Sequence, residues 1–265
     1  MHVEQRMREL GKWSTIGERR CPSAQLTLVF GPTETLCDRA TWTELADMYP
    51  GARIVGCSTA GEITGSRVVD DTLVATALSF EHGHVAVAAA QLSETADSKS
   101  LGELLASRIP KQGLVHVLVL SDGIKVNGSE LVTGITQMLE PGIAVTGGLS
   151  ADGARFAHTA VCLDGPTPSQ QVVAIGLYGD HLQIGYGSLG GWDPFGVERS
   201  ITRSAGNVLY ELDGEPALDL YKRYLGEHAA GLPASGLLFP LTIRSGTTDD
   251  TAVVRTILAL SLIHI

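Results

Sequence analysis

The sequence predicts an α/β fold of mixed β-sheets with packed helices, built from an internally duplicated unit of strand, helix, strand and hairpin. Short apolar runs bounded by Gly and Pro alternate with segments of helical periodicity, which indicates strands and helices in turn. Hydrophobic residues make up 44% of the 265 residues and charged residues 18%, a balance typical of a globular chain with a sizeable core.

The first unit covers about residues 25–90. Its apolar runs and turn residues predict a strand, a helix and a second strand, followed by a Gly-rich loop and a hairpin. In order, these elements are a strand at 25–30, a helix at 35–48 ending at Pro50-Gly51, a strand at 53–55, the loop 56–62, and a hairpin of 73–80 and 84–90.

The second unit covers about residues 115–188 and follows the first element by element. Its elements are a strand at 116–120, a helix at 127–139 ending at Pro141-Gly142, a strand at 143–146, the loop 147–153, and a hairpin of 172–178 and 182–187. A helix at 100–109 separates the units. The match indicates a diverged duplication, although ordinary α/β order could produce it by chance. Because ligands bind at the carboxyl ends of strands in α/β sheets, the two Gly-rich loops are expected to line one pocket.

The remaining residues complete the predicted domain plan. Residues 1–24 are expected to be a polar lead-in with room for a short helix, 25–205 a first domain, and 206–265 the start of another. Pro216 at a first turn predicts a helix over 216–225 that buries Ala217, Leu220 and Leu225. Strands are predicted at 237–243 and 252–260.

Charge and cysteine usage exclude several classes of function. The net charge is −10, so neither nucleic acid nor an anionic membrane surface is an expected partner. The apolar run 252–265 contains Arg255 and is too short to insert in a membrane. The four cysteines lack CxxC spacing, which favours reduced thiols over a zinc site. Since residues 1–21 also lack the apolar stretch of a signal peptide, a cytoplasmic location is expected.

Several motifs occur in the order found in FIST proteins (F-box and intracellular signal transduction). They are IVGCSTAGEI at 54–63, LSDG at 120–123, GGLSAD at 147–152 with Phe156, GWDPFG at 191–196, LDG at 212–214 with PALDLY at 216–221, Pro240-Leu241, and Val254-Arg255. The chain thus resembles the FIST N-terminal region over 25–205, with duplicated units inside it. Residues 206–265 resemble the start of a C-terminal region that is truncated, because a complete one would continue well past Arg255.

The resemblance implies an intracellular sensory domain that binds a small ligand, such as an amino acid, and relays to a partner signalling protein. The partners it implies are a histidine kinase, a diguanylate cyclase or a chemoreceptor, as in bacterial two-component signalling. Some members of the family look like haem-dependent nitric oxide sensors, so a haem-based sensor is the first alternative. No other cofactor and no metal site are expected.

The candidate ligand-binding residues lie in the two Gly-rich loops and at neighbouring strand ends. Small residues let the backbone approach a ligand, and exposed N–H groups can hold an anion. The alternative is a set of tight turns whose hydroxyls and carboxylates cap their own backbone. The candidates are Cys57, Ser58, Thr59, Gly61, Glu62, Ser121, Asp122, Gly147, Gly148, Asp152 and Trp192, the last as a stacking platform or an apolar plug.

No catalytic residue is expected, and a hydrolase or acyl transferase using Cys57 or Ser58 is the second alternative. Ser58 lacks the Gly-x-Ser-x-Gly spacing of a nucleophile elbow, and Cys57 would need a nearby histidine. A buried structural cysteine is favoured instead. His82, His84 and His181 fall at the two hairpin turns, where solvated side chains are favoured over metal or haem ligands.

Overall fold

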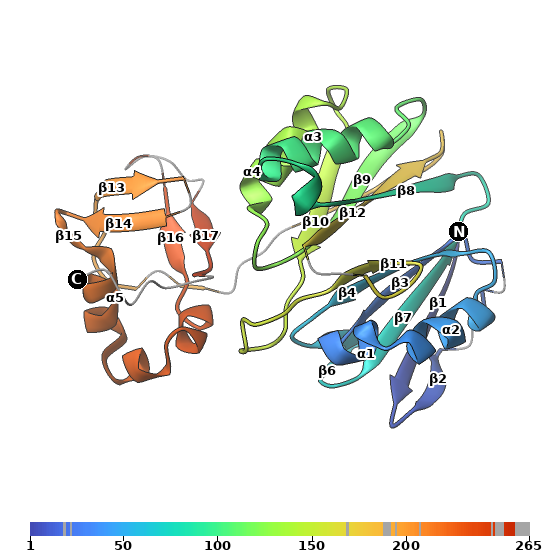
Figure 1. The fold of residues 1–265 in the computed structure, drawn as a ribbon, viewed down its shortest axis with the longest axis horizontal. Helices are drawn as coiled ribbons and strands as arrows, with labels where there is room; N and C mark the ends of the chain where they lie inside the picture. The colour runs from blue at the N-terminus through green and yellow to red at the C-terminus, as the bar shows by residue number, and fades with distance from the viewer. Residues whose placement is uncertain are drawn as a thin grey trace. The chain divides into compact units, whose positions relative to one another are not determined.

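The protein is described from a computed structural model, which confirms an α/β fold with several mixed sheets (Figure 1). The chain divides into two compact units, Met1–Tyr186 and Gly187–Ile265. The structure describes all residues except 18, 19, 22, 168, 169, 188–191, 194, 207, 245, 247–251 and 258–265.

The first unit contains a six-stranded sheet, here called the first sheet, with strand order β11-β4-β3-β7-β1-β2. Strands β3 and β4 are parallel and every other pairing is antiparallel. The strands are β1 (His2–Glu9), β2 (Lys12–Ile16), β3 (Leu26–Gly31), β4 (Arg53–Ser58), β7 (Leu73–Ser79) and β11 (Val161–Leu163). Helices α1 (Thr33–Cys37) and α2 (Arg39–Met48) connect β3 to β4, as parallel strands require a crossover.

The second sheet of this unit has four strands in the order β10-β9-β12-β8. Its elements are β8 (His84–Gln91), β9 (Leu114–Ser121), β10 (Ala144–Leu149) and β12 (Gln171–Tyr178), with helices α3 (Ser98–Arg108) and α4 (Gly128–Gln137). Strands β9 and β10 are parallel and are joined through α4. The short elements are η1 (Leu92–Glu94), β5 (Glu62–Thr64) and β6 (Arg67–Val69).

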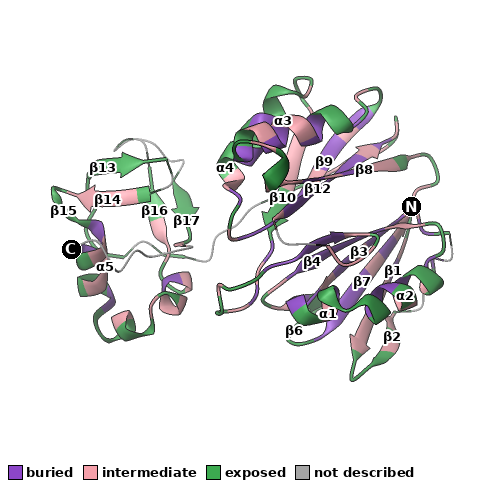
Figure 2. Cartoon of the chain, in the orientation of Figure 1, coloured by how far each residue is buried: buried purple, intermediate pink, exposed green. Residues whose placement is uncertain are grey.

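The two sheets pack face to face between two layers of helices (Figure 1). Because side chains alternate along a strand, Leu26 of β3 faces the other sheet whereas Val29 faces helices α1 and α2. Val173 and Ile175 of β12 meet Leu26 in the shared core. Figure 2 shows this buried band along the central strands of both sheets. The parallel pair β3–β4 is therefore covered on both faces, which suits its near-continuous apolar sequence.

The described residues of the lead-in form no helix, although the sequence was expected to allow one; His2–Ile16 instead form the hairpin β1–β2 at the edge of the first sheet. Strand β1 pairs with β7 from His2 to Arg8. The strand alternates polar with less polar side chains, and Glu4 is buried at 3% exposure. The polar sequence of this strand did not indicate a buried element. The buried Glu4 carboxylate is tolerated there because it pairs with Arg6 and accepts a hydrogen bond from the Cys21 N–H.

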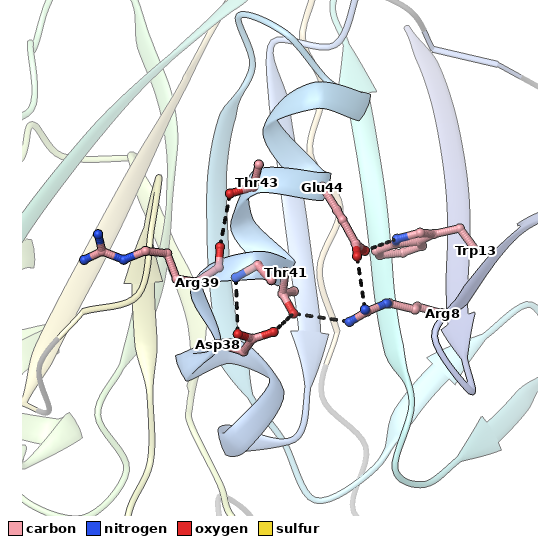
Figure 3. Close-up of polar contacts among 8 residues, drawn as sticks. Arg8, Trp13, Asp38, Arg39, Thr41, Thr43 and Glu44 are labelled. Atoms are coloured by element: carbon pink, nitrogen blue, oxygen red, sulfur yellow. Dashed lines mark hydrogen bonds and ion pairs between the residues drawn. The ribbon is translucent and has the colours of Figure 1, made fainter.

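Side-chain bonds attach this hairpin to α2 (Figure 3). The Glu44 carboxylate accepts from Arg8 Nη2 at 3.2 Å and from Trp13 Nε1 at 3.0 Å. Asp38 caps α2 by accepting from the Ala40 N–H, and its other oxygen accepts from the Thr41 hydroxyl. The helix that crosses over between β3 and β4 is thus bonded to the edge of its own sheet.

Both predicted hairpins are wrong. Strands β7 and β8 follow one another in sequence but lie in different sheets, because the turn at 80–83 carries the chain from one sheet to the other. Residues 182–187 follow β12 without forming a strand. Local alternation specifies a strand but not its partner, and here the partners come from distant segments. In both sheets a third strand, β7 or β12, pairs antiparallel with the first strand of the parallel pair. The duplication itself stays a prediction.

The described residues of the second unit form two small sheets, the α-helix α5 and two short 3-10 helices. Helix α5 (Ala217–Leu225) confirms the predicted helix and buries the three predicted residues. The other elements are β13 (Ile201–Ala205), β14 (Val208–Leu212), β15 (Glu215–Pro216), η2 (Gly226–Gly231), η3 (Ala234–Leu237), β16 (Leu241–Ile243) and β17 (Val253–Arg255). The strand predicted at 237–243 is confined to 241–243, and that at 252–260 to 253–255, with 258–260 outside the described residues. The β13–β14 hairpin spans the division expected at 205/206.

Among the described residues, no helix combines the length and the hydropathy needed to cross a bilayer.

The contact between α3 and α4 is backbone against backbone. A Cβ atom on Gly134 would lie 2.0 Å from the carbonyl oxygen of Lys99. We therefore expect Gly134→Ala to lower the free energy of unfolding by about 1–3 kcal/mol, measured by urea denaturation. Gly128→Ala in the same helix is the control, because its Cβ would meet only a side chain, that of Leu149, at 3.5 Å. Equal stability of Gly134→Ala and the wild type would contradict this packing.

Candidate functional site

The carboxyl ends of β4, β9 and β10 meet at one place in the first unit, here called the strand-end junction (residues 57–62, 121–125, 147–152 and 156–160). Its centre is Ser58, which is fully buried at the end of β4. Ser58 donates its N–H to the Ala160 carbonyl at 2.8 Å and accepts from the Ala160 N–H through Oγ at 2.9 Å. Its own carbonyl accepts from the Ala151 N–H at 2.8 Å. The loop that follows β10 of the second sheet is therefore bonded to the last residue of β4.

Asp152 organises the loop after β10. One carboxylate oxygen accepts from the Phe156 N–H and the other from the Ala157 and His158 N–H groups, at 2.8–3.0 Å. Burial alone would raise the pKa of Asp152, but these three bonds and the nearby Arg155 outweigh it and hold the pKa below its ordinary value. The carboxylate therefore stays ionised and fixes the turn that leads back to Ser58.

The Asp122 carboxylate likewise accepts hydrogen bonds that hold the turn at the end of β9. Oδ1 accepts from the N–H groups of Ile124 and Lys125 at 3.0 and 2.7 Å, and Oδ2 accepts from the Thr159 hydroxyl at 3.1 Å. The adjacent Ser121 hydroxyl donates to the Asp122 carbonyl at 3.1 Å. Both candidate aspartates thus cap the protein's own backbone, which was the alternative to ligand binding at these positions.

Glu62 is also occupied by the protein itself. It is 2% exposed, one oxygen accepts from the Thr59 hydroxyl at 2.7 Å, and the other accepts from the N–H and hydroxyl of Thr72. Gly61 precedes Glu62, and a Cβ atom on it would lie 3.1 Å from Oδ1 of Asp70. The loop after β4 is held to the start of β7 by this carboxylate.

The remaining candidates differ in exposure. Gly147 is pressed against β9, where a Cβ would lie 1.9 Å from the Val119 carbonyl oxygen, whereas Gly148 faces open space. Both are exposed on the strand β10. Trp192 is 49% exposed and lies in the second unit, so the structure does not bring it together with the other candidates as part of one unit.

Ser150 is a residue of the junction that sequence reasoning did not select. It is 4% exposed, donates its N–H to the Ser121 carbonyl at 2.8 Å, and its hydroxyl has no hydrogen-bond partner among the described residues. A buried hydroxyl without a partner is unusual and is relieved by a ligand or a water molecule. The sequence signal that could have identified Ser150 was its place inside the GGLSAD motif.

Cys57 and Ser58 are poorly placed for the nucleophilic chemistry considered as an alternative. Burial raises the pKa of the Cys57 thiol to about 12, with a further contribution from Cys162. A thiol needs to ionise to attack a substrate, so this environment opposes the reaction. The Ser58 hydroxyl accepts a backbone N–H and has no exposed surface.

Haem binding was the other alternative and needs an imidazole directed into an apolar cavity. Of the described histidines only His116 is buried, at 3% exposure, and its Nε2 lies 2.8 Å from the Thr146 hydroxyl. Burial lowers the pKa of His116, which keeps the ring neutral. The described part of the chain therefore has no histidine set that fits a haem.

A family model described as the FIST N domain matches residues 25–215. The matched range contains every candidate residue of the strand-end junction and Trp192. No curated protein matches the chain.

The bonds at Asp152 predict a pH-dependent effect of Asp152→Asn. We expect the variant to lose about 1–3 kcal/mol of unfolding free energy at pH 7, because a buried charged acceptor is removed. Since the folded pKa is depressed, this contribution is present above the unfolded pKa of about 3.9 and is lost as the pH falls through the folded pKa. The difference in unfolding free energy between the wild type and the variant should therefore become smaller in acid, as measured by urea denaturation at a series of pH values.

The control for that experiment is Asp47→Asn on the exposed face of α2, which should change stability little at any pH. The assigned role would be contradicted if Asp152→Asn were as stable as the wild type at pH 7, or if the difference in their unfolding free energies stayed constant as the pH falls.

Proposed function

The chain belongs to the FIST N domain family of signal-transduction sensory domains, and on this premise we propose that it senses a small ligand at the rim of the strand-end junction and relays the signal to a partner protein. The observation that carries the proposal is the buried, unpartnered hydroxyl of Ser150 beside the exposed end of β10. The ligand class we favour is a free amino acid.

The exposed end of β10 supplies suitable chemistry. Among the described strands β10 pairs only with β9, so its outer edge carries unpaired N–H and C=O groups. Gly147 and Gly148 are exposed there, and Gly148 has no neighbour in the way of an approaching ligand. An amino acid presents a carboxylate that accepts from N–H groups and an ammonium that donates to carbonyls. A strand edge offers both kinds of group side by side.

The carboxylates that seemed suited to hold a ligand ammonium have a different part in this proposal. Asp122, Asp152 and Glu62 are satisfied by the protein and keep the junction rigid. A rigid support holds the strand edge in one geometry before the ligand arrives, which lowers the entropic cost of binding.

The relay follows from the position of the junction between the sheets. The loop after β10 is bonded to β4 through Ser58, so a ligand on β10 acts on a segment shared by both sheets. A ligand that prefers one packing of that segment shifts the population toward it. A histidine kinase, a diguanylate cyclase or a chemoreceptor is the kind of partner that would register the change.

The test is a calorimetric and thermal-shift screen of the chain against the free amino acids, followed by the same screen on Gly148→Val. We expect a ligand to raise the melting temperature by mass action, and Gly148→Val to weaken its binding by at least about tenfold because the side chain fills the open space beside the strand end. Ala144→Val is the matched control, since it lies on the same face of β10 further from the rim. A chain that binds no amino acid, or a Gly148→Val variant that binds like the wild type, would overturn the proposal.

A further inference from the structure

A cluster of histidines lies at the opposite end of the second sheet from the strand-end junction. His82 belongs to the turn between β7 and β8, His84 begins β8, and His181 follows the end of β12. His82, His84 and Tyr178 line an open pocket of about 340 Å³, here called the histidine pocket, and the His181 ring lies beside the His82 ring. The pocket lining includes Gly113, which precedes β9, so the pocket lies at the amino end of that strand.

The backbone fixes the two turns against each other. A Cβ on Gly83 would lie 2.5 Å from the Tyr178 carbonyl oxygen, and one on Gly179 would lie 2.7 Å from the His82 carbonyl oxygen. Only glycine at both positions allows this approach. His82 and His181 are consequently held side by side by main-chain contacts rather than by chance orientation of mobile loops.

The wall behind them is rigid. Tyr178 is 1% exposed, and its hydroxyl donates to the Pro110 carbonyl at 2.8 Å. The His84 ring stacks on the Tyr178 ring at 4.5 Å between centroids with an interplanar angle of 8°. One imidazole of the cluster is thus already fixed in orientation.

The rings of His82 and His181 lie 6.3 Å apart between centroids, with an interplanar angle of 79°. Two imidazoles on one zinc ion have centroids roughly 5–6 Å apart, given a metal–nitrogen distance of about 2.1 Å. Among the described residues no three His, Cys, Asp or Glu side chains already stand as a closed metal-ligand set. The ion therefore needs a small rotation of these two exposed side chains, and water completes its coordination.

The charge around the pocket favours a cation. Glu81 and Asp180 lie on its rim, and Glu81 also pairs with His2 at 3.3 Å and with the amino group of Met1 at 3.0 Å. Imidazole nitrogens with carboxylates nearby suit zinc, copper and nickel better than calcium or magnesium.

We propose that one divalent transition-metal ion, such as Zn²⁺, binds between His82 of the histidine pocket and the neighbouring His181. The ion would tie the turn that carries the chain between the two sheets to the end of β12. This site is separate from the proposed ligand site, and neither depends on the other.

The test is isothermal titration of the untagged, full chain with Zn²⁺ alone, together with thermal melts. We expect one bound equivalent and a rise in melting temperature, because the ion binds the folded state. His82→Ala and His181→Ala should each weaken binding by at least about tenfold, as removal of a ligand does. His228→Ala, which removes an exposed histidine of the second unit, should leave the affinity unchanged.

Three results would overturn the proposal. One is no binding of Zn²⁺ by the wild type up to about millimolar concentration. Another is unchanged affinity in the His82→Ala/His181→Ala double variant, provided that it melts like the wild type without metal. The last is loss of binding in His2→Ala with full binding in the double variant, which would place the ion at the N-terminus.

Discussion

The bonds made by Ser58 set the constraint on which the rest of the first unit depends. Its N–H, its carbonyl and its hydroxyl all bond to the segment that follows β10, and that segment then supplies β11 to the first sheet. A strand end buried between two sheets leaves polar groups that water cannot reach, so each must find a partner inside the protein. The carboxylates of Asp122, Asp152 and Glu62 provide these partners for the adjoining turns.

In this arrangement, the residues that hold the junction together differ from those proposed to contact the ligand. The carboxylates of Asp122, Asp152 and Glu62 are buried and hold turns of the junction, whereas Gly147 and Gly148 expose nearly bare backbone. Among the described residues of the junction, Ser150 alone has a buried hydroxyl without a hydrogen-bond partner. Under the function proposed above, the ligand acts through the segment that the two sheets share, because that is where packing on one sheet can alter packing on the other.

Local sequence signals predicted the elements well and their partners poorly. The apolar runs, the Pro-Gly stops and Pro216 located the central strands and helix α5, because these signals act within a few residues. The hairpin β1–β2 was missed because a buried ion pair at Glu4 gives it a polar sequence. Alternation could not show that β7 and β8 belong to different sheets. The loops of the junction were found from their glycines and motifs, but spacing could not show that Asp152 and Glu62 face their own backbone.

Native-state hydrogen exchange at the amides of Ser58, Ala151 and Ala160 tests the central role of the junction most directly. If these bonds join the two sheets, the three amides exchange only with the same opening free energy as core strand amides such as those of Val119 and Val173. Exchange of the three amides at a much lower opening free energy, while the core strands stay protected, would show that the sheets hold together without them and would contradict this account.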